Sequence, residues 1–241
     1  MSTPTFEYEN KLVDSGFTNI CGIDEVGRGP LAGPVVASAV IISAELFKDS
    51  SKFKSINDSK KLSEKSREKW HDFLTKREKI KWGIGIVSEK IIDRINILEA
   101  TKLAMMEAIK MLVRQPADMP ASAMFQRGEP DFLLIDGNFT LEIPDLSQKA
   151  IPRGDAKVIS IAAASIIAKV TRDRMMRQYH EDYPEYGFDK HKGYGTAMHI
   201  EMIKKYGPCA IHRKSFEPIK GMVSPKAHKV YKVCKVKSKM T

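Results

Sequence analysis

The sequence has little cysteine and no long apolar run, and both scarcities restrict its class. Its three cysteines, Cys21, Cys209 and Cys234, are odd in number, widely spaced and form no Cys-x-x-Cys pair. This pattern argues against a disulfide framework or a zinc knuckle and favours a cytoplasmic protein. No apolar run approaches the roughly 18 residues needed to span a bilayer, and the first residues lack the basic and apolar regions of a secretory signal.

Negative charge is outnumbered by positive charge, and this imbalance indicates a class of partner rather than one activity. The 241 residues carry a formal net charge of +10 at pH 7, with a pI of about 9.4. Such a chain favours a polyanionic partner, although ribosomal, membrane-surface and nuclease proteins all share this balance. With 42% apolar and 29% charged residues, the sequence is typical of one large globular domain, or of one domain with an appendage.

Apolar runs and turn residues predict an α/β chain. Two apolar, β-branched runs, 20–26 and 34–42, flank a Gly- and Pro-rich connection and are expected to pair antiparallel. The long helix that stops before Pro184 is expected to end in solvated charges, Arg172 among them. The other predicted strands are 80–87, 132–135 and 149–151, and the predicted helices are 63–76, 89–95, 97–113, 197–206 and one from 153 to before Pro184.

The stretch Gly22–Gly33 combines two acids with a flexible backbone. Asp24 and Glu25 follow an apolar lead-in, and an arginine flanked by glycines comes next. Carboxylates beside a bare backbone suit a cation site that lets a ligand approach the main chain. Taken alone, the stretch is equally consistent with a strand that enters a Gly-rich turn with solvated charges.

Two further acids stand at element ends. Asp136 follows the apolar run 132–135, and Asp155 opens the long helix, where a cap is the simpler interpretation. Ligands gather at the carboxyl ends of strands in an open α/β sheet, so these acids are expected to meet Asp24 and Glu25. Clustered carboxylates without His or Cys favour Mg²⁺ or Mn²⁺, and two such ions would support phosphodiester hydrolysis. Because side chains alternate along a strand, Asp24 and Glu25 face one ion only if the strand ends or twists between them.

Basic and aromatic residues lie in loops between the predicted elements. Lys60 and Lys61 precede a predicted helix, where positive charge opposes the helix dipole, although a solvated helix start is the simpler explanation. A second basic loop places Tyr194 between two glycines, and a third contains Arg213 and Lys214.

Six blocks of the sequence, in one order between residues 20 and 220, resemble bacterial ribonuclease HII. They are DEVGRGP from Asp24, NDSKKL from Asn57, IDGN from Ile135, Gly154-Asp155 with the Ala-rich run after it, HKGYGT from His191 and HRKSF from His212. The resemblance implies a ribonuclease H-like fold, with a mixed five-stranded sheet flanked by helices and a small C-terminal helical extension. It implies a monomeric endonuclease, dependent on Mg²⁺ or Mn²⁺, that cuts the RNA strand of RNA–DNA hybrids. It also implies cutting beside single ribonucleotides in duplex DNA, with 3′-hydroxyl and 5′-phosphate ends, and no membrane partner.

The resemblance also assigns roles residue by residue. It implies a set of catalytic, metal-binding acids: Asp24, Glu25, Asp136 and Asp155. It implies a loop that reads the 2′-hydroxyl, the group that separates RNA from DNA, formed by Gly27, Arg28 and Gly29. The tyrosine that stacks at the ribonucleotide sugar is matched by Tyr194. Phosphate contacts are implied for Lys60, Lys61, Arg213 and Lys214.

The resemblance covers most of the chain and indicates how the chain divides into four parts. They are an N-terminal arm at 1–19, a catalytic domain at 20–183, a helical and basic-loop extension at 184–225, and a basic tail at 226–241. Some relatives carry a Glu five residues after the fourth acid, but Ser160 stands there, so no fifth carboxylate is expected. The 115–130 segment and the tail are longer than usual, and extra duplex affinity is one explanation for them.

Two other functions remain compatible with the sequence. Another two-metal nuclease of the same fold, such as a resolvase or transposase core, is disfavoured by the Gly-Arg-Gly and Gly-Tyr-Gly loops. A non-catalytic basic protein that binds RNA or duplexes would need the basic loops but not the acids, and this chain has both.

Overall fold

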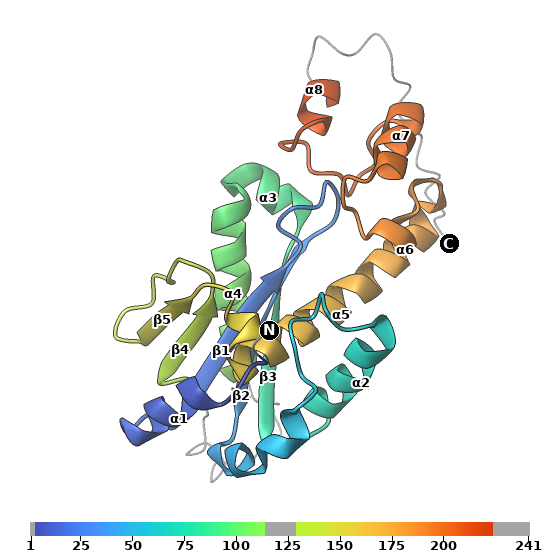
Figure 1. Ribbon diagram of the computed structural model, residues 1–241. Helices are drawn as coiled ribbons and strands as arrows, with labels where there is room; N and C mark the ends of the chain where they lie inside the picture. The colour runs from blue at the N-terminus through green and yellow to red at the C-terminus, as the bar shows by residue number, and fades with distance from the viewer. Residues whose placement is uncertain (1–2, 114–128, 224–241) are drawn as a thin grey trace, which may run out of the picture. The chain divides into compact units, whose positions relative to one another are not determined.

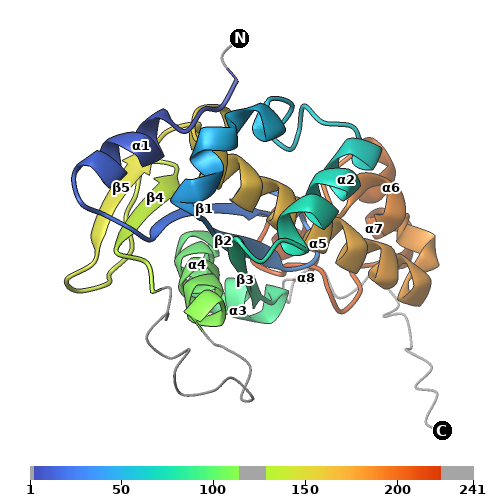
Figure 2. The same ribbon diagram turned by 90° about the horizontal axis from the view of Figure 1, so that it is seen from below.

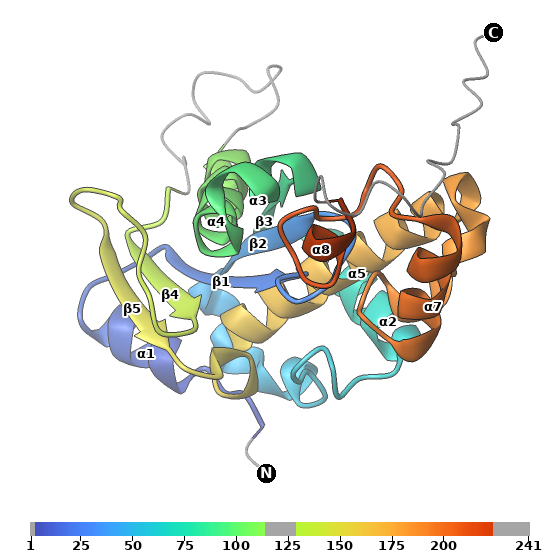
Figure 3. The ribbon, with the colours of Figure 1, turned by 90° about the horizontal axis from the view of Figure 1, so that it is seen from above.

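The computed structural model describes residues 3–113 and 129–223, and these residues contain a five-stranded sheet (Figure 1). The strand order is β3–β2–β1–β4–β5, which Figure 3 shows from above. β1 (Ile20–Val26) pairs antiparallel with β2 (Val35–Ile42), as predicted, and parallel with β4 (Phe132–Asp136). β5 (Ser147–Ile151) pairs parallel with β4, and β3 (Ile80–Val87) forms the opposite edge. The predicted mixed five-stranded sheet is confirmed.

The described residues fall into two compact units. The first unit lies within Met1–Val26, Val36–Ile86 and Thr101–Thr171, and contains the sheet. The second lies within Gly27–Val35, Val87–Ala100 and Arg172–Thr241. The loop between β1 and β2 therefore groups with the C-terminal part of the chain, although it sits inside the catalytic domain expected from the sequence.

In the first unit, helices cover both faces of the sheet (Figure 2). On one face, buried residues of β2 and β3 pack against η1 (Ala44–Phe53), α2 (Glu64–Thr75) and the first part of α5 (Ile159–Asp182). The alanines of α5 are fully buried there, because small side chains let a helix approach a sheet closely. On the other face lies α4 (Ile97–Val113), so close that a Cβ on Gly85 of β3 would stand 1.8 Å from the Ala104 carbonyl oxygen.

The second unit is helical and has its own core. Its elements are α3 (Glu89–Ile95), the rest of α5, η4 (Pro184–Tyr186), α6 (Phe188–His191), α7 (Ala197–Tyr206) and α8 (Ile219–Val223). The buried residues of this core come from loops and helices far apart in sequence, and include Leu31, Met176, Phe188, Ile203, Ile211 and Ile219.

Several elements differ from the sequence prediction. The long helix begins at Ile159 and not at 153, because Arg153 takes a left-handed conformation (φ 55°, ψ 45°) and the chain then makes the short turn η3 (Gly154–Ala156). The segments η1, α6 and α8 were not predicted, and residues 7–14 form a regular helix, α1 (Glu7–Asp14).

Most of the 115–130 segment and all of the basic tail lie outside the described residues. Among the helices of residues 3–113 and 129–223, none combines the length and apolarity that a membrane crossing needs.

Candidate active site

Two of the predicted acids lie side by side because β1 and β4 run parallel. Ile23 pairs with Ile135 across these strands, so the residues that follow them, Asp24 and Asp136, occupy adjacent positions. Asp136 ends its strand, and Asp24 stands two residues before the end of β1. Asp24 is buried and Asp136 is half-buried. The register of the sheet therefore brings these carboxylates together.

The turn that carries Asp155 is fastened to Asp136. Asp136 pairs with Ile151 at the end of β5, and the chain then turns through η3. The Gly154 N–H donates to Asp136 Oδ1 at 2.5 Å, which holds the neighbouring Asp155 close to the strand end. The Asp155 side chain is itself buried, with 8% of its surface exposed. A third predicted acid thus joins the first two.

The pKa values of Asp24 and Asp155 are both raised, in part because the acids lie close together. Burial, followed by the charges of Glu25 and Asp136, raises the pKa of Asp24 well above its usual range. Burial, followed by the charges of Asp136 and Asp58, raises the pKa of Asp155 to about 6, against the opposing effect of Lys60. Carboxylates that disfavour each other's ionisation in a partly buried place need a compensating positive charge if all are to be ionised.

The strand that carries Asp24 continues without interruption through Glu25. Pairing with β2 continues through Glu25↔Ala37 and Val26↔Val36, so the strand neither ends nor loses register after Asp24. Side chains alternate along such a strand, and the Glu25 N–H donates to Asp24 Oδ1 at 2.7 Å. The strand therefore does not end between the two acids, although the Glu25 charge still acts on Asp24.

The acids have the chemistry of a site for a hard divalent cation. Their donors are carboxylate oxygens, which Mg²⁺ and Mn²⁺ prefer, and a bound cation would offset the burial and the repulsion that raise the pKa values of Asp24 and Asp155. Within residues 3–113 and 129–223, no three His, Cys, Asp or Glu side chains already stand in a metal-binding arrangement.

In the second unit, the loop after β1 is built for close backbone contacts. Gly27 has a φ of +95°, and a Cβ there would lie 2.3 Å from Arg172 Nε and 2.7 Å from the Pro34 carbonyl oxygen. A glycine is therefore required at this position. The next two residues, Arg28 and Gly29, are exposed.

Tyr194 lies next to this loop. A Cβ on Gly29 would stand 3.8 Å from Tyr194 Cε1, and the Leu31 N–H donates to the Gly193 carbonyl oxygen at 2.8 Å. The tyrosine side chain is 39% exposed. The exposed glycine–arginine pair and an exposed aromatic ring thus share one surface of the second unit.

Arg213 holds the Gly27 loop and is not placed to contact a phosphate. Its side chain is fully buried, and its guanidinium donates to three carbonyl oxygens, those of Gly27, Arg28 and Gly33, at 2.5–3.0 Å. Burial lowers its pKa to about 9. The expected phosphate contact is therefore corrected to a structural role, because the buried guanidinium donates to carbonyl oxygens of the protein itself.

Arg172 is fully buried, although the sequence pattern predicts a solvated helix end at this position. Its Nε donates to Pro34 O at 2.9 Å, Nη2 to Ala32 O at 3.1 Å and Nη1 to Lys192 O at 2.9 Å, so it bonds to both loops of the second unit. A signal was present, because Arg172 shares a helical face with Met176, four residues on.

A pair of neutral histidines supports the Tyr194 loop. The Tyr194 carbonyl can only accept, so His199 Nδ1 donates to it, at 2.9 Å. His212 Nδ1 accepts from the Cys209 N–H, which leaves its Nε2–H to donate to His199 Nε2 at 3.1 Å. Burial lowers the pKa of His199 to about 4 and that of His212 to about 3, so both stay neutral at pH 7.

The remaining predicted phosphate contacts are exposed lysines. Lys60 and Lys61 follow Asp58, which accepts from their backbone N–H groups, and they belong to the unit that contains the acids. Lys214 belongs to the other unit, where its N–H donates to Asp93 Oδ2 at 2.9 Å. In each case the backbone is anchored and the side chain is exposed.

Comparison with known proteins gives consistent results. A family model described as ribonuclease HII matches residues 21–219. A ribonuclease HII of Chlamydia trachomatis serovar L2 is 49% identical over 214 residues, which is 88% of each chain. The crystal structure of ribonuclease H2 from Pyrococcus horikoshii OT3 is similar, with a TM-score of 0.63, 26% identity, and coverage of 84% of this chain and 96% of that one. The ribonuclease HII in a PCNA complex from Archaeoglobus fulgidus has a TM-score of 0.64 and 25% identity, over 82% and 95% of the two chains. The predicted ribonuclease H-like fold is confirmed.

Proposed function

Because the chain belongs to the ribonuclease HII family, an endonuclease family that cleaves RNA in RNA–DNA hybrids, we propose that it also cuts beside single ribonucleotides embedded in duplex DNA. The reaction is a two-metal-ion phosphodiester hydrolysis that leaves 3′-hydroxyl and 5′-phosphate ends. Membership of this enzyme family removes the alternative of a non-catalytic binding protein. A monomeric state and a cytoplasmic location stay predictions.

The metal ligands are the predicted acids: Asp24, Glu25, Asp136 and Asp155. Mg²⁺ or Mn²⁺ ions, when bound, activate the attacking water and stabilise the leaving oxygen. The protein supplies the strand register and the turn at Gly154 that bring three of these carboxylates together. Bound ions would lower the raised pKa values of Asp24 and Asp155, since a positive charge favours the ionised carboxylate.

Recognition of the ribonucleotide belongs to the loops of the second unit. Glycine amides can approach a 2′-hydroxyl where a side chain would clash, and that hydroxyl distinguishes RNA from DNA. Gly27, Arg28 and Gly29 supply this backbone, and Tyr194 stacks at the sugar. The buried guanidiniums of Arg172 and Arg213 support the proposal, because they fix the loop backbone through its carbonyl groups.

Binding of the duplex backbone belongs to exposed lysines. Lys60, Lys61 and Lys214 are the proposed phosphate contacts, and each has an anchored backbone and an exposed side chain. Such contacts give affinity that falls with salt and do not select a sequence.

The observation that carries this proposal is geometric: the strand register places Asp136 beside Asp24, and the Gly154 N–H bond to Asp136 holds Asp155 close to both. The test is incubation with duplex DNA that bears one ribonucleotide, with and without Mg²⁺, beside an all-DNA duplex of the same sequence. We expect metal-dependent cutting of the first duplex alone. Equal cutting of both duplexes would contradict the ribonucleotide assignment, and cutting in a chelator would contradict the metal assignment.

A further inference from the structure

The N-terminal arm of the first unit is paired with the segment that follows Asp155. Thr5 forms a parallel bridge with Val158: the Thr5 N–H donates to Lys157 O at 3.0 Å, and the Ile159 N–H donates to Thr5 O at 3.3 Å. These contacts join residues about 150 positions apart in sequence, and Thr5 lies before the part of the chain that the family model matches. The arm is therefore an integral part of the unit that contains the acids.

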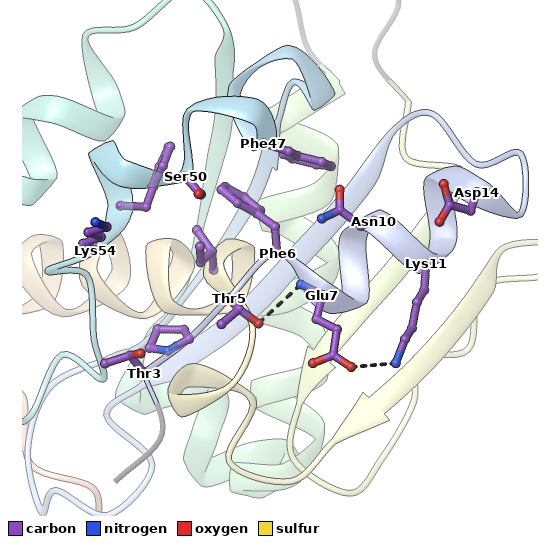
Figure 4. A pocket seen from close by; sticks show the side chains of 13 residues that line it. Thr3, Thr5, Phe6, Glu7, Asn10, Lys11, Asp14, Phe47, Ser50 and Lys54 are labelled. Atoms are coloured by element: carbon purple, nitrogen blue, oxygen red, sulfur yellow. Dashed lines mark hydrogen bonds and ion pairs between the residues drawn. The ribbon is translucent and has the colours of Figure 1, made fainter.

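Aromatic packing anchors the arm on its other side. Phe6 is 4% exposed, stacks on Phe47 of η1 with ring centroids 4.5 Å apart, and meets Phe53 edge-on at 5.1 Å. Figure 4 shows Phe6 and Phe47 beside the polar residues of α1, around a cavity of about 550 Å³. Thr5 and its neighbours are thus fixed to the body of the unit and do not depend on the bridge alone.

Glu9 extends this attachment to the start of α5. Its side chain is 1% exposed, although it is a carboxylate, and its Oε1 accepts the Ser160 backbone N–H at 2.9 Å. Ser160 is the second residue of α5, whose first N–H groups have no partner within the helix. A side chain from a distant helix therefore caps α5, and burial raises its pKa to about 7.

Asp155 stands between this attachment and the strand end. On one side, Asp136 Oδ1 accepts the Gly154 N–H at 2.5 Å. On the other side, Lys157 N–H and Val158 N–H both donate to Gly154 O, and the arm then holds the residues from Lys157 onward. The backbone on both sides of Asp155 is thus fixed by side chains and strands outside its own turn.

We infer that Glu9 is a positioning residue that, together with the Thr5 bridge, fixes the turn carrying Asp155 and so tunes metal binding at the acids. The inference rests on the proposed metal-binding role of Asp155. Glu9 touches neither metal nor substrate, and its effect passes through Ser160 and the first turn of α5.

The expected effect is a loss of metal affinity. Removing a group bonded directly to a metal ligand typically weakens metal binding roughly 10–100-fold. Glu9 acts one step further away, so we expect Glu9→Ala to raise the Mn²⁺ dissociation constant about three- to tenfold, with a fall in thermal stability from the lost cap.

The test is calorimetric titration of Mn²⁺ into the full chain, with thermal unfolding as a second readout. Glu9→Gln keeps an oxygen acceptor for Ser160, so its Mn²⁺ affinity should stay within about twofold of the wild type. Glu7→Ala is the matched control, because Glu7 lies on the same helix, is exposed and pairs with Lys11. Thr5→Pro removes the N–H that bonds to Lys157 O and provides a second, independent loosening of the arm.

The outcomes separate the inference from the function on which it rests. Wild-type Mn²⁺ affinity in a folded Glu9→Ala or Thr5→Pro protein, whatever its stability, would overturn the inference and leave Glu9 a merely structural cap. Loss of affinity in Glu9→Gln equal to that in Glu9→Ala would overturn it also. If Glu9→Ala does not fold, the Mn²⁺ affinities of Thr5→Pro and Glu9→Gln take its place: the inference requires weakened binding in Thr5→Pro and near wild-type binding in Glu9→Gln. Unchanged affinity in Asp155→Asn would instead contradict the proposed metal site itself.

Discussion

Replacement of Arg213 by lysine distinguishes a loop-holding residue from a phosphate contact. The guanidinium makes four hydrogen bonds to three carbonyl oxygens, at 2.5–3.0 Å, from a fully buried position. A lysine keeps the charge but lacks the planar fork, and one ammonium group cannot reach all three carbonyls. Arg213→Lys should therefore leave about two buried carbonyl groups without partners, at roughly 1–3 kcal/mol each.

We expect a loss of about 3 kcal/mol in the free energy of unfolding. For a chain of this size, that corresponds to a fall in Tm of roughly 6–12 °C. At a temperature where the variant is folded, cutting at a single ribonucleotide should fall more than cutting of a long hybrid, because the loop at Gly27 loses its support.

Thermal unfolding and cleavage of the two substrates at several salt concentrations provide the assay. The adjacent exposed lysine gives a matched control: Lys214→Ala should leave Tm unchanged and make binding less dependent on salt. If Arg213→Lys kept the wild-type Tm and changed only the salt dependence, the guanidinium would be a phosphate contact and the structural account of it would be wrong.

The remaining predictions address the acids, the tyrosine, the tail and the buried glutamate. Asp24→Asn should abolish turnover in a cleavage assay yet leave hybrid binding largely intact, since ligand charge holds the ions; an active variant would refute this. Tyr194→Ala should reduce cutting at a lone ribonucleotide more than on a long hybrid, and equal losses would count against sugar stacking. Truncation after Val223 removes the lysines of the tail and should weaken duplex binding chiefly at low salt; an unchanged salt slope would take the tail out of the interface. Burial raises the pKa of Glu9 from 4.5 to about 7 in the folded protein, so the contribution of Glu9 to the free energy of unfolding falls as pH rises from 4.5 to 7. Urea unfolding should therefore show Glu9→Gln gaining stability relative to the wild type at pH 8 compared with pH 5, and a pH-independent difference would contradict the raised pKa.

The strands and the acids were predictable because their signals are local. The apolar runs 20–26 and 80–87 coincide with β1 and β3, since β-branched runs bounded by turn residues leave little alternative. Asp24 lies near the end of such a run, Asp136 ends another, and Asp155 lies in the turn before a helix. The parallel register of β1 and β4 then places two of them at adjacent positions.

The supporting residues were not predictable, because their partners are distant in sequence. Arg172 and Arg213 look like surface charges, and only the folded second unit supplies the carbonyl groups that receive them. Glu9 is likewise an ordinary helix-surface acid until the turn after Asp155 brings Ser160 to it. The start of α5 was placed too early, since a left-handed Arg153 leaves no distinctive trace in the sequence.

The position of bound metal decides whether the acids form one metal site. Crystals of the full chain grown with Mn²⁺ allow the ions to be located by their anomalous scattering. We expect ions bound by Asp24, Asp136 and Asp155, with Glu25 as the fourth ligand. Ions bound elsewhere, or bound by fewer than three of these carboxylates, would show that the acids do not form the proposed metal site.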